Sequence, residues 1–223
     1  MVTASPVGVD RVPAVLVTGF EPFGGDEVNP SWLAAHALHG KRIAGHLVVA
    51  AQLPTVFDRS LVVLRELLAS NKPALVVCTG QAGGRAAVGL ERVAINVNDA
   101  RIADNAGARP VDAPVIAGGP AAYFSSLPIK AMLAALESAG LRAEVSQTAG
   151  TFVCNHVFYG LMHELATQPA LAGVRGGLVH VPWLPQQGQP SMALDDIVRG
   201  LEVAIERALT TGVDIRKQAG ALN

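Results

Sequence analysis

The sequence predicts an α/β protein with a single domain, in which a mostly parallel, twisted sheet is flanked by helices. Short apolar runs of strand length alternate with longer stretches of helical periodicity, the pattern of a parallel sheet covered by helices. Over 223 residues the apolar fraction is 50% and the charged fraction 16%, which is enough for one large core. No repeat and no change of composition divides the chain, so we interpret residues 1–223 as one domain.

Five segments are predicted to be strands because they are short, apolar and mostly rich in β-branched residues. In chain order they are 14–18, 46–51, 74–79, 143–147 and 177–181. Each has the length of a strand buried in a parallel sheet.

Five further segments have helical periodicity. They are 30–38, the segment that follows Thr55, 129–138, about 153–168, and 191–209. The helix after Thr55 has the strongest support, because four leucines between positions 61 and 68 fall on one face. Thr55 is predicted to be its N-cap, with Asp58 at the third helical position. Gly140 is expected to end the helix at 129–138.

Two segments do not follow this alternation. Residues 80–105 are rich in glycine and charge, and residues 111–127 are rich in proline and glycine. Long irregular segments in a compact domain are usually functional, so we expect functional residues near them.

Charge and apolar patterning exclude several classes of protein. Seventeen Lys and Arg against eighteen Asp and Glu give a net charge of −1 without a basic block, so nucleic-acid binding has no electrostatic support. The uncharged stretch 145–162 contains too many polar side chains to span a membrane. The first thirteen residues lack the features of a signal peptide, so we expect a cytoplasmic, reducing location and two free cysteines.

The two cysteines are predicted to differ in environment. Cys78 lies inside the buried-strand pattern LVVCTG and is interpreted as a core residue. Cys154 stands where a turn passes into a helix, and the free amides of a helix N-terminus stabilise a thiolate. Cys154 is therefore the candidate nucleophile. On these residues alone, a buried cysteine in the first helical turn remains the alternative.

A cysteine nucleophile needs a basic partner, and the chain has six histidines. His180 lies near the carboxyl end of a predicted strand, the edge at which parallel sheets bind ligands. If the turn before Cys154 also follows a strand's carboxyl end, the two side chains face one crevice. An acid usually orients the histidine, and Glu91, Asp99 and Asp104 remain open candidates. The other histidines are interpreted as solvated, as supporting residues or as pointing elsewhere: His36, His39, His46, His156 and His163.

The glycine-rich segments do not match nucleotide-binding patterns. The segment 19–25, GFEPFGG, lacks the Lys and Ser or Thr of a P-loop, and the segment 80–85, GQAGGR, does not match G-x-G-x-x-G. H-E-x-x-H, C-x-x-C and acidic ladders with calcium spacing do not occur either. We therefore expect no nucleotide-binding loop and no metal.

Several motifs follow one another along the chain. They are VTGFEPFGGDEVNPSW, GQAGGRAAVGLERVAINVNDARIADNAG, PVDAPVIAGGPAAYFSSLPIK, SQTAGTFVCNHVFYGLMH and GLVHVPWLPQQ. Together they resemble the pyroglutamyl peptidase I family, also called pyrrolidone-carboxylate peptidases, which are cytoplasmic cysteine peptidases. The resemblance begins at about Val15 and leaves residues 1–10 as an N-terminal extension, which we expect to be poorly ordered.

The resemblance implies a triad in which Cys154 is the nucleophile, His180 the base and Glu91 the acid. It also implies a slot for a five-membered lactam, in which Gln81 hydrogen-bonds the ring, and it suggests that Arg101 stabilises the oxyanion. The substrate-binding residues that it implies are Phe20, Phe23, Asn29, Thr55, Gln81, Phe152 and Val153. The chain departs from the family pattern at Ala103 and Gln186, where proline and glutamate are usual.

The function that the resemblance implies is removal of an N-terminal pyroglutamyl residue from peptides through a thioester, without a cofactor. The implied fold is an α/β/α sandwich like that of purine nucleoside phosphorylases, and the implied assembly is a dimer or tetramer of identical chains. Two alternatives remain at this point. A nucleoside phosphorylase or hydrolase would cleave a nucleoside, and an inactive module would bind pyroglutamyl peptides without turnover.

Overall fold

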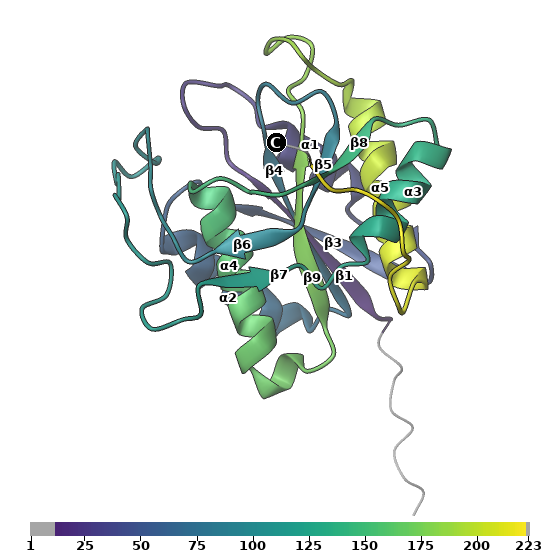
Figure 1. Ribbon diagram of the computed structural model, residues 1–223, viewed down its shortest axis with the longest axis horizontal. Coiled ribbons are helices and arrows are strands. Elements are labelled where there is room, and N and C mark those ends of the chain that lie inside the picture. The colour runs from purple at the N-terminus through teal and green to yellow at the C-terminus, as the bar shows by residue number, and fades with distance from the viewer. Residues whose placement is uncertain (1–11, 222–223) are drawn as a thin grey trace, which may run out of the picture.

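A seven-stranded mixed sheet forms the centre of the protein, with helices on both of its faces (Figure 1). The computed structural model describes residues 12–221. The strand order is β2-β3-β1-β4-β9-β5-β8. These strands are β1 (Ala14–Phe20), β2 (Arg42–Ile43), β3 (His46–Leu53), β4 (Leu75–Gln81), β5 (Val88–Glu91), β8 (Ala143–Ser146) and β9 (Arg175–Val181). Two further strands, β6 (Val93–Ile95) and β7 (Ala122–Phe124), form a separate small sheet.

The five predicted strands are confirmed, with boundaries that differ by no more than two residues. Four of the six pairings in the large sheet are parallel, which confirms the predicted α/β class. The sequence reasoning missed β2, β5, β6 and β7. The last three lie inside the segments 80–105 and 111–127, which were expected to be irregular. The predicted extension at residues 1–10 lies outside the described residues.

The direction of β5 and β8 differs from that of the central strands. β5 runs antiparallel to β9, with Gly89 opposite His180, and β8 runs parallel to β5. β8 therefore ends toward the opposite edge of the sheet from β9. As predicted, Cys154 and His180 face one cavity, but β8 and β9 do not end at the same edge of the sheet. The loop after β8 brings Cys154 toward His180 instead.

Helices α1, α3 and α5 cover one face of the sheet, and α2 and α4 cover the other (Figure 1). Their bounds are α1 (Pro30–Leu38), α2 (Arg59–Asn71), α3 (Ile129–Ser138), α4 (Val153–Thr167) and α5 (Leu194–Thr210), with a short 3-10 turn η1 (Pro169–Leu171). The five predicted helices are confirmed. None of the helices in the described part of the chain has both the length and the apolar character needed to cross a bilayer.

The predicted N-cap of α2 is wrong. The Thr55 hydroxyl donates to the carbonyl of Glu21 at 2.8 Å, and α2 begins only after Asp58, whose φ is 55°. Thr55 thus bonds to a different loop rather than to the helix. The expected end of α3 is confirmed, because Gly140 follows the helix with φ of 74°, the left-handed conformation that glycine adopts without strain.

Alternate residues of the central strands point into two apolar layers. Val77 of β4 packs in the layer beneath α1, α3 and α5, whereas Val76 and Cys78 pack in the layer beneath α2 and α4. Burial on both faces accounts for the nearly continuous apolar sequence of these strands. Cys78 is fully buried, which confirms its interpretation as a core residue.

Candidate active site

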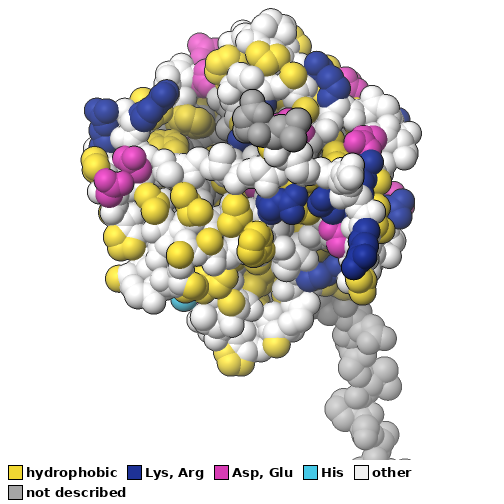
Figure 2. All heavy atoms as spheres, in the orientation of Figure 1, with side chains coloured by type: hydrophobic (Ala, Val, Ile, Leu, Met, Phe, Trp, Pro, Cys, Tyr) yellow, Lys and Arg dark blue, Asp and Glu magenta, His cyan; other side chains and the backbone are white. Residues whose placement is uncertain are grey.

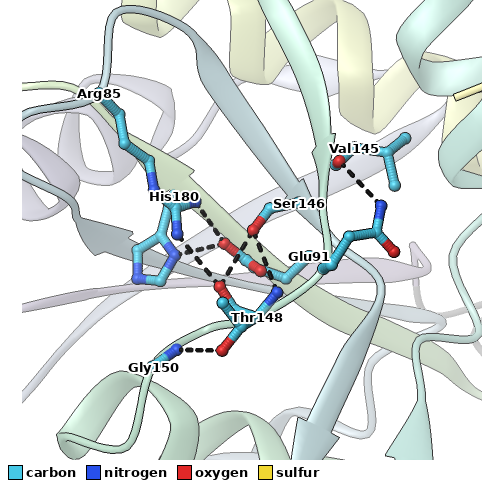
Figure 3. A network of polar contacts seen from close by, with 8 residues as sticks. Arg85, Glu91, Val145, Ser146, Thr148, Gly150 and His180 are labelled. Carbon is cyan, nitrogen blue, oxygen red and sulfur yellow. Dashed lines mark hydrogen bonds and ion pairs between the residues drawn. The ribbon is translucent and has the colours of Figure 1, made fainter. Parts of the chain in front are cut away.

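His180 and Glu91 meet because β9 and β5 are neighbours in the sheet. The ring Nδ1 of His180 lies 2.7 Å from Glu91 Oε1, and both side chains are buried (Figure 3). Burial alone would raise the pKa of Glu91, but the hydrogen bond and electrostatic interaction with His180, then the nearby Ser146 side chain and the charge of Arg85, lower it. An ionised carboxylate only accepts hydrogen bonds, so Nδ1 carries the hydrogen and Nε2 is free to accept a proton.

Cys154 is the second residue of α4 and lies against β4 where that strand carries Gly80. A Cβ atom placed on Gly80 would lie 2.7 Å from Cys154 Sγ and 3.2 Å from His180 Nε2. The sulfur and this ring nitrogen are therefore within about 6 Å of each other. The thiol is half-buried and free.

The resting state of Cys154 differs from the expectation. Burial and, to a smaller extent, the negative charge of Glu91 raise the pKa of the Cys154 thiol to about 12, although the charge of Arg85 partly opposes this rise. The helix terminus therefore does not by itself produce a thiolate. A base must take the thiol proton as the reaction begins, and His180 Nε2 is the nearby group with a free lone pair.

A cavity of about 480 Å³ opens beside Cys154 and His180. Its walls include Phe23 and Phe152, whose ring centroids are 5.7 Å apart. The other lining residues are Gln81, Ala82, Gly83, Arg85, Asp99, Arg101, Ile102, Ala149, Gly150 and Thr151. Two aromatic rings beside a thiol form an apolar slot with polar groups at its margin, as expected for a small cyclic ligand.

Four residues that the resemblance assigns to the substrate site do not line this cavity: Phe20, Asn29, Thr55 and Val153. All four are buried, and two of them hold the turn that precedes Phe23. Asn29 Nδ2 and Thr55 Oγ1 both donate to the carbonyl of Glu21, at 3.1 and 2.8 Å. Asn29 and Thr55 thus hold the loop that carries Phe23, and direct contact of the four residues with a substrate stays a prediction.

The side chain of Gln81 is already bound within the protein. Its Nε2 donates to Asp26 Oδ2 at 2.6 Å, and its Oε1 accepts from Gln187 Nε2 at 3.1 Å. Gln187 also donates to the carbonyl of Val28 at 3.3 Å. This clamp joins the loops around residues 26, 81 and 187. A ligand in the cavity therefore meets the main chain of Gln81 more readily than its amide group.

The structure separates the three candidate acids. Glu91 contacts His180, whereas Asp99 is exposed at the rim of the cavity. Asp104 is buried in its own loop, where its carboxylate accepts the amide N–H groups of Phe57, Ala106 and Ala108. Asp104 is thus a structural residue, and Glu91 alone faces the imidazole.

The other histidines lie outside the cavity. His156 is fully buried two residues after Cys154, and its Nε2 accepts the amide N–H of Asp58 while its Nδ1 contacts Asn98 Oδ1. Burial lowers the pKa of His156 to about 4, so this ring is neutral near pH 7. His163 lies 2.9 Å from the hydroxyl of Tyr123 and supports α4.

Sequence reasoning missed three residues that contact the proposed site residues. Arg85 pairs with Glu91, and Asp26 and Gln187 hold Gln81. The sequence indicates these residues only by their positions next to the glycine-rich segments, since Arg85 ends GQAGGR and Asp26 follows GFEPFGG. Their partners are distant or on separate strands, so spacing could not identify them.

A half-buried thiol, an imidazole whose other ring nitrogen contacts a buried carboxylate, and that carboxylate, gathered at one cavity of an α/β sheet, define a hydrolase of the cysteine-peptidase class. The sequence profile of the pyroglutamyl peptidase family matches residues 13–211. The chain therefore belongs to this family, and the predicted resemblance is confirmed.

Individual relatives agree with this assignment. The chain is 57% identical over 217 residues to the pyrrolidone-carboxylate peptidase of Cupriavidus taiwanensis, which covers 95% of this chain and 100% of that protein. It is 58% identical over 217 residues to pyrrolidone-carboxylate peptidase 1 of Ralstonia nicotianae, with coverage of 95% and 100%. The crystal structure of pyroglutamyl peptidase I from Bacillus amyloliquefaciens matches with a TM-score of 0.90 at 46% identity, covering 93% of this chain and 100% of that one.

A more distant structure has the same fold. The pyrrolidone carboxyl peptidase of Thermococcus litoralis matches with a TM-score of 0.88 at 33% identity, covering 92% of this chain and 99% of that one. The comparisons thus support a peptidase over the alternative of a nucleoside phosphorylase.

Proposed function

We propose that this protein removes N-terminal pyroglutamyl residues from peptides, with Cys154 as nucleophile, His180 as base and acid, and Glu91 as the group that orients His180. The observation that carries the proposal is the convergence of α4, β9 and β5 on one cavity. The names of the relatives support the substrate class.

The first half of the reaction forms a thioester. His180 Nε2 takes the thiol proton as the sulfur of Cys154 attacks the pyroglutamyl carbonyl carbon. The carbonyl oxygen becomes an oxyanion beside the first amides of α4, which have no partner within the helix. The imidazolium then donates its proton to the leaving nitrogen, the C–N bond breaks, and the shortened peptide departs with a free amine.

The second half hydrolyses the thioester. Water enters the place of the departed amine and gives a proton to His180 Nε2 as its oxygen attacks the acyl carbon. Collapse of the second tetrahedral intermediate breaks the C–S bond. The proton returns to the sulfur, and pyroglutamate leaves. Throughout, Glu91 holds the ring N–H and stabilises the imidazolium without accepting its proton.

The lactam occupies the apolar slot and packs against the rings of Phe23 and Phe152, which contact each other. The ring has one N–H and one C=O, and the main chain of Gln81 at the edge of β4 supplies the complementary groups, since its side chain is held by the clamp. Phe20, Asn29, Thr55 and Val153 support these walls. Arg101 is exposed at the cavity and adds positive charge near the oxyanion.

The decisive experiment is hydrolysis of a chromogenic pyroglutamyl amide by the parent protein and by Cys154→Ser and Cys78→Ser. We expect Cys154→Ser to lose activity and Cys78→Ser to keep it, because only Cys154 lines the cavity. Full activity in Cys154→Ser would exclude the proposed nucleophile. Binding of the amide by the parent without turnover would favour an inactive binding module.

A second experiment tests the slot. Phe23→Ala should raise KM more than it lowers kcat, because a ring wall holds substrate and transition state alike. Val62→Ala is a suitable control, since Val62 is exposed on α2 away from the cavity. An unchanged KM in Phe23→Ala would argue against the slot.

We also propose that the protein associates with copies of itself. Figure 2 shows apolar side chains gathered over the region of β6 and β7. Phe124 of β7 is 71% exposed, a large apolar side chain that an interface would bury. Sedimentation of the parent and of Phe124→Ser tests this. We expect the variant to shift toward the monomer, and a monomeric parent at micromolar concentration would refute the proposal.

A reducing, cytoplasmic location fits the chemistry of the proposed site. Cys154 lies at a cavity and must stay a free thiol to act. Activity measured over a range of glutathione redox ratios should fall as the buffer becomes oxidising and return on reduction. Insensitivity to oxidation would remove this support.

A further inference from the structure

Arg85 contacts two parts of the proposed catalytic site at once. Its Nη1 donates to Glu91 Oε1 at 2.7 Å, and its Nη2 donates to the carbonyl of Thr148 at 3.1 Å (Figure 3). Thr148 belongs to the loop that leads into α4 and therefore to Cys154. Arg85 thus joins the strand that carries the acid to the loop that carries the nucleophile.

The Glu91 carboxylate has few partners. Oε1 accepts from both Arg85 and His180, each at 2.7 Å, whereas Oε2 is buried without a hydrogen-bond partner in the described structure. Removing one partner from a buried carboxylate is costly and changes its orientation. Arg85 supplies one of the two hydrogen bonds that aim this carboxylate at the imidazole.

We propose that Arg85 is a positioning residue of the hydrolysis, which orients Glu91 toward His180 and places a positive charge beside the Cys154 thiol. This inference rests on the roles proposed above for these three residues. The guanidinium supplies a fixed positive charge and a hydrogen bond to Glu91, which the thiol and the imidazole do not replace.

The charge of Arg85 acts on several neighbours. It lowers the pKa of Cys154, whereas burial and the charge of Glu91 raise that pKa. Two further charged groups face the cavity, Asp99 and Arg101, and the Cys78 thiol lies in the core close by. Both groups at the rim are exposed, so solvent screens them more than the pair of Arg85 with buried Glu91.

Arg85→Met gives the main test. Loss of a positive charge favours the protonated form of every neighbouring group, so both limbs of the pH profile of kcat/KM should move to higher pH by about one unit. Arg85→Lys keeps the charge but lacks the planar fork that reaches Glu91 and Thr148 together. Its profile should keep the parent's position while kcat falls about tenfold.

Gly89→Ala tests the geometry without changing any charge. A Cβ atom at Gly89 would lie 2.8 Å from Arg85 Nη1 and 3.7 Å from Glu91 Oε1. The flexible end of Arg85 can move aside, so the strand accommodates the methyl group. We expect kcat to fall about tenfold, as in Arg85→Lys, with a smaller shift of the pH profile than in Arg85→Met.

Arg92 offers a matched control. It follows Glu91 directly, but its side chain donates to Gln147 Oε1 and to the carbonyl of Ala219 and does not line the cavity. Arg92→Met should therefore keep the parent's kcat and pH profile. Thermal unfolding of each variant identifies any that does not fold. If Arg85→Met does not fold, the kcat values and pH profiles of Arg85→Lys and Gly89→Ala test the proposal.

The outcomes separate the two proposals. If Cys154→Ser is inactive while Arg85→Met keeps the parent's activity, or loses it equally at every pH, the role of Arg85 is overturned and the proposed nucleophile stands. If Cys154→Ser hydrolyses the pyroglutamyl amide at the parent's rate, the proposed function itself fails. A shifted Arg85→Met profile with a normal position in Arg85→Lys supports the inference.

Discussion

Replacing Gly80 by alanine should disable the site while leaving the fold in place. The added Cβ would lie 2.7 Å from Cys154 Sγ, 3.1 Å from His180 Cδ2 and 3.2 Å from its Nε2. The distance to the sulfur is about 1 Å shorter than an ordinary contact, so the thiol or the imidazole must move by about that amount. A misplacement of about 1 Å can cost about 100-fold in rate, or about 2.7 kcal/mol of transition-state stabilisation.

The measurement is kcat and KM for a chromogenic pyroglutamyl amide, with thermal unfolding of the same samples. We expect kcat to fall about 100-fold in Gly80→Ala at nearly constant KM, with about 1–3 kcal/mol of destabilisation from crowding. Gly200→Ala is the control, since the nearest atoms to its added methyl group lie at 3.6 Å and belong to the core. Parent-like kcat in Gly80→Ala would refute the assignment of Cys154 and His180 as reacting partners.

Four other predictions follow from the site. Iodoacetamide should label Cys154 and spare buried Cys78. The labelling rate should rise with pH, because the Cys154 pKa is raised to about 12. Peptide mapping that finds the label on Cys78 and not on Cys154 would contradict this prediction. His180→Ala should abolish turnover, whereas Glu91→Gln should only lower it, since the imidazole remains; equal kcat values would contradict these roles. Prolyl amides lack the ring carbonyl and should be hydrolysed orders of magnitude more slowly than pyroglutamyl amides, and similar kcat/KM values would exclude polar recognition of the lactam. The unfolded chain protonates His156 near pH 6.5, whereas the folded protein protonates it only near pH 4. The free energy of unfolding should therefore fall by on the order of 3 kcal/mol as the pH drops through this window. Denaturant titrations of His156→Gln should lack this pH-dependent loss of stability.

Local patterns predicted most of the fold because the central strands and the helices are long enough to have a period. β4 is buried on both faces and reads as an apolar run, and α2 has its leucines on one side. β5 has only four residues, including Gly89 and Glu91, and therefore no recognisable alternation. Its identity as a strand depends on pairing with β9 and β8, which are distant in the chain.

Thr55 shows how a correct local rule can fail. Its hydroxyl suits an N-cap, but the fold places the carbonyl of Glu21 within 2.8 Å, and this tertiary partner takes the hydrogen bond. The helix then begins only after Asp58.

The site was predictable only in part. The position of Cys154 at a helix start and of His180 near a strand end made each a candidate, but local spacing could not choose among Glu91, Asp99 and Asp104. The choice comes from the antiparallel pairing of Gly89 with His180, which places Glu91 beside the imidazole. The environment of Cys154 was also missed, because burial and the charge of Glu91 outweigh the helix terminus.

The place of β9 in the sheet has a consequence for the synthesis of the protein. β4 and β5 are consecutive large-sheet strands in the chain, yet β9, made about a hundred residues later, lies between them. In a nascent chain that ends before residue 175, the edges of β4 and β5 that pair with β9 are unpaired. Such a chain also lacks His180. Thiol, base and acid can therefore be assembled only after most of the polypeptide has left the ribosome, so an incomplete chain is not a working peptidase.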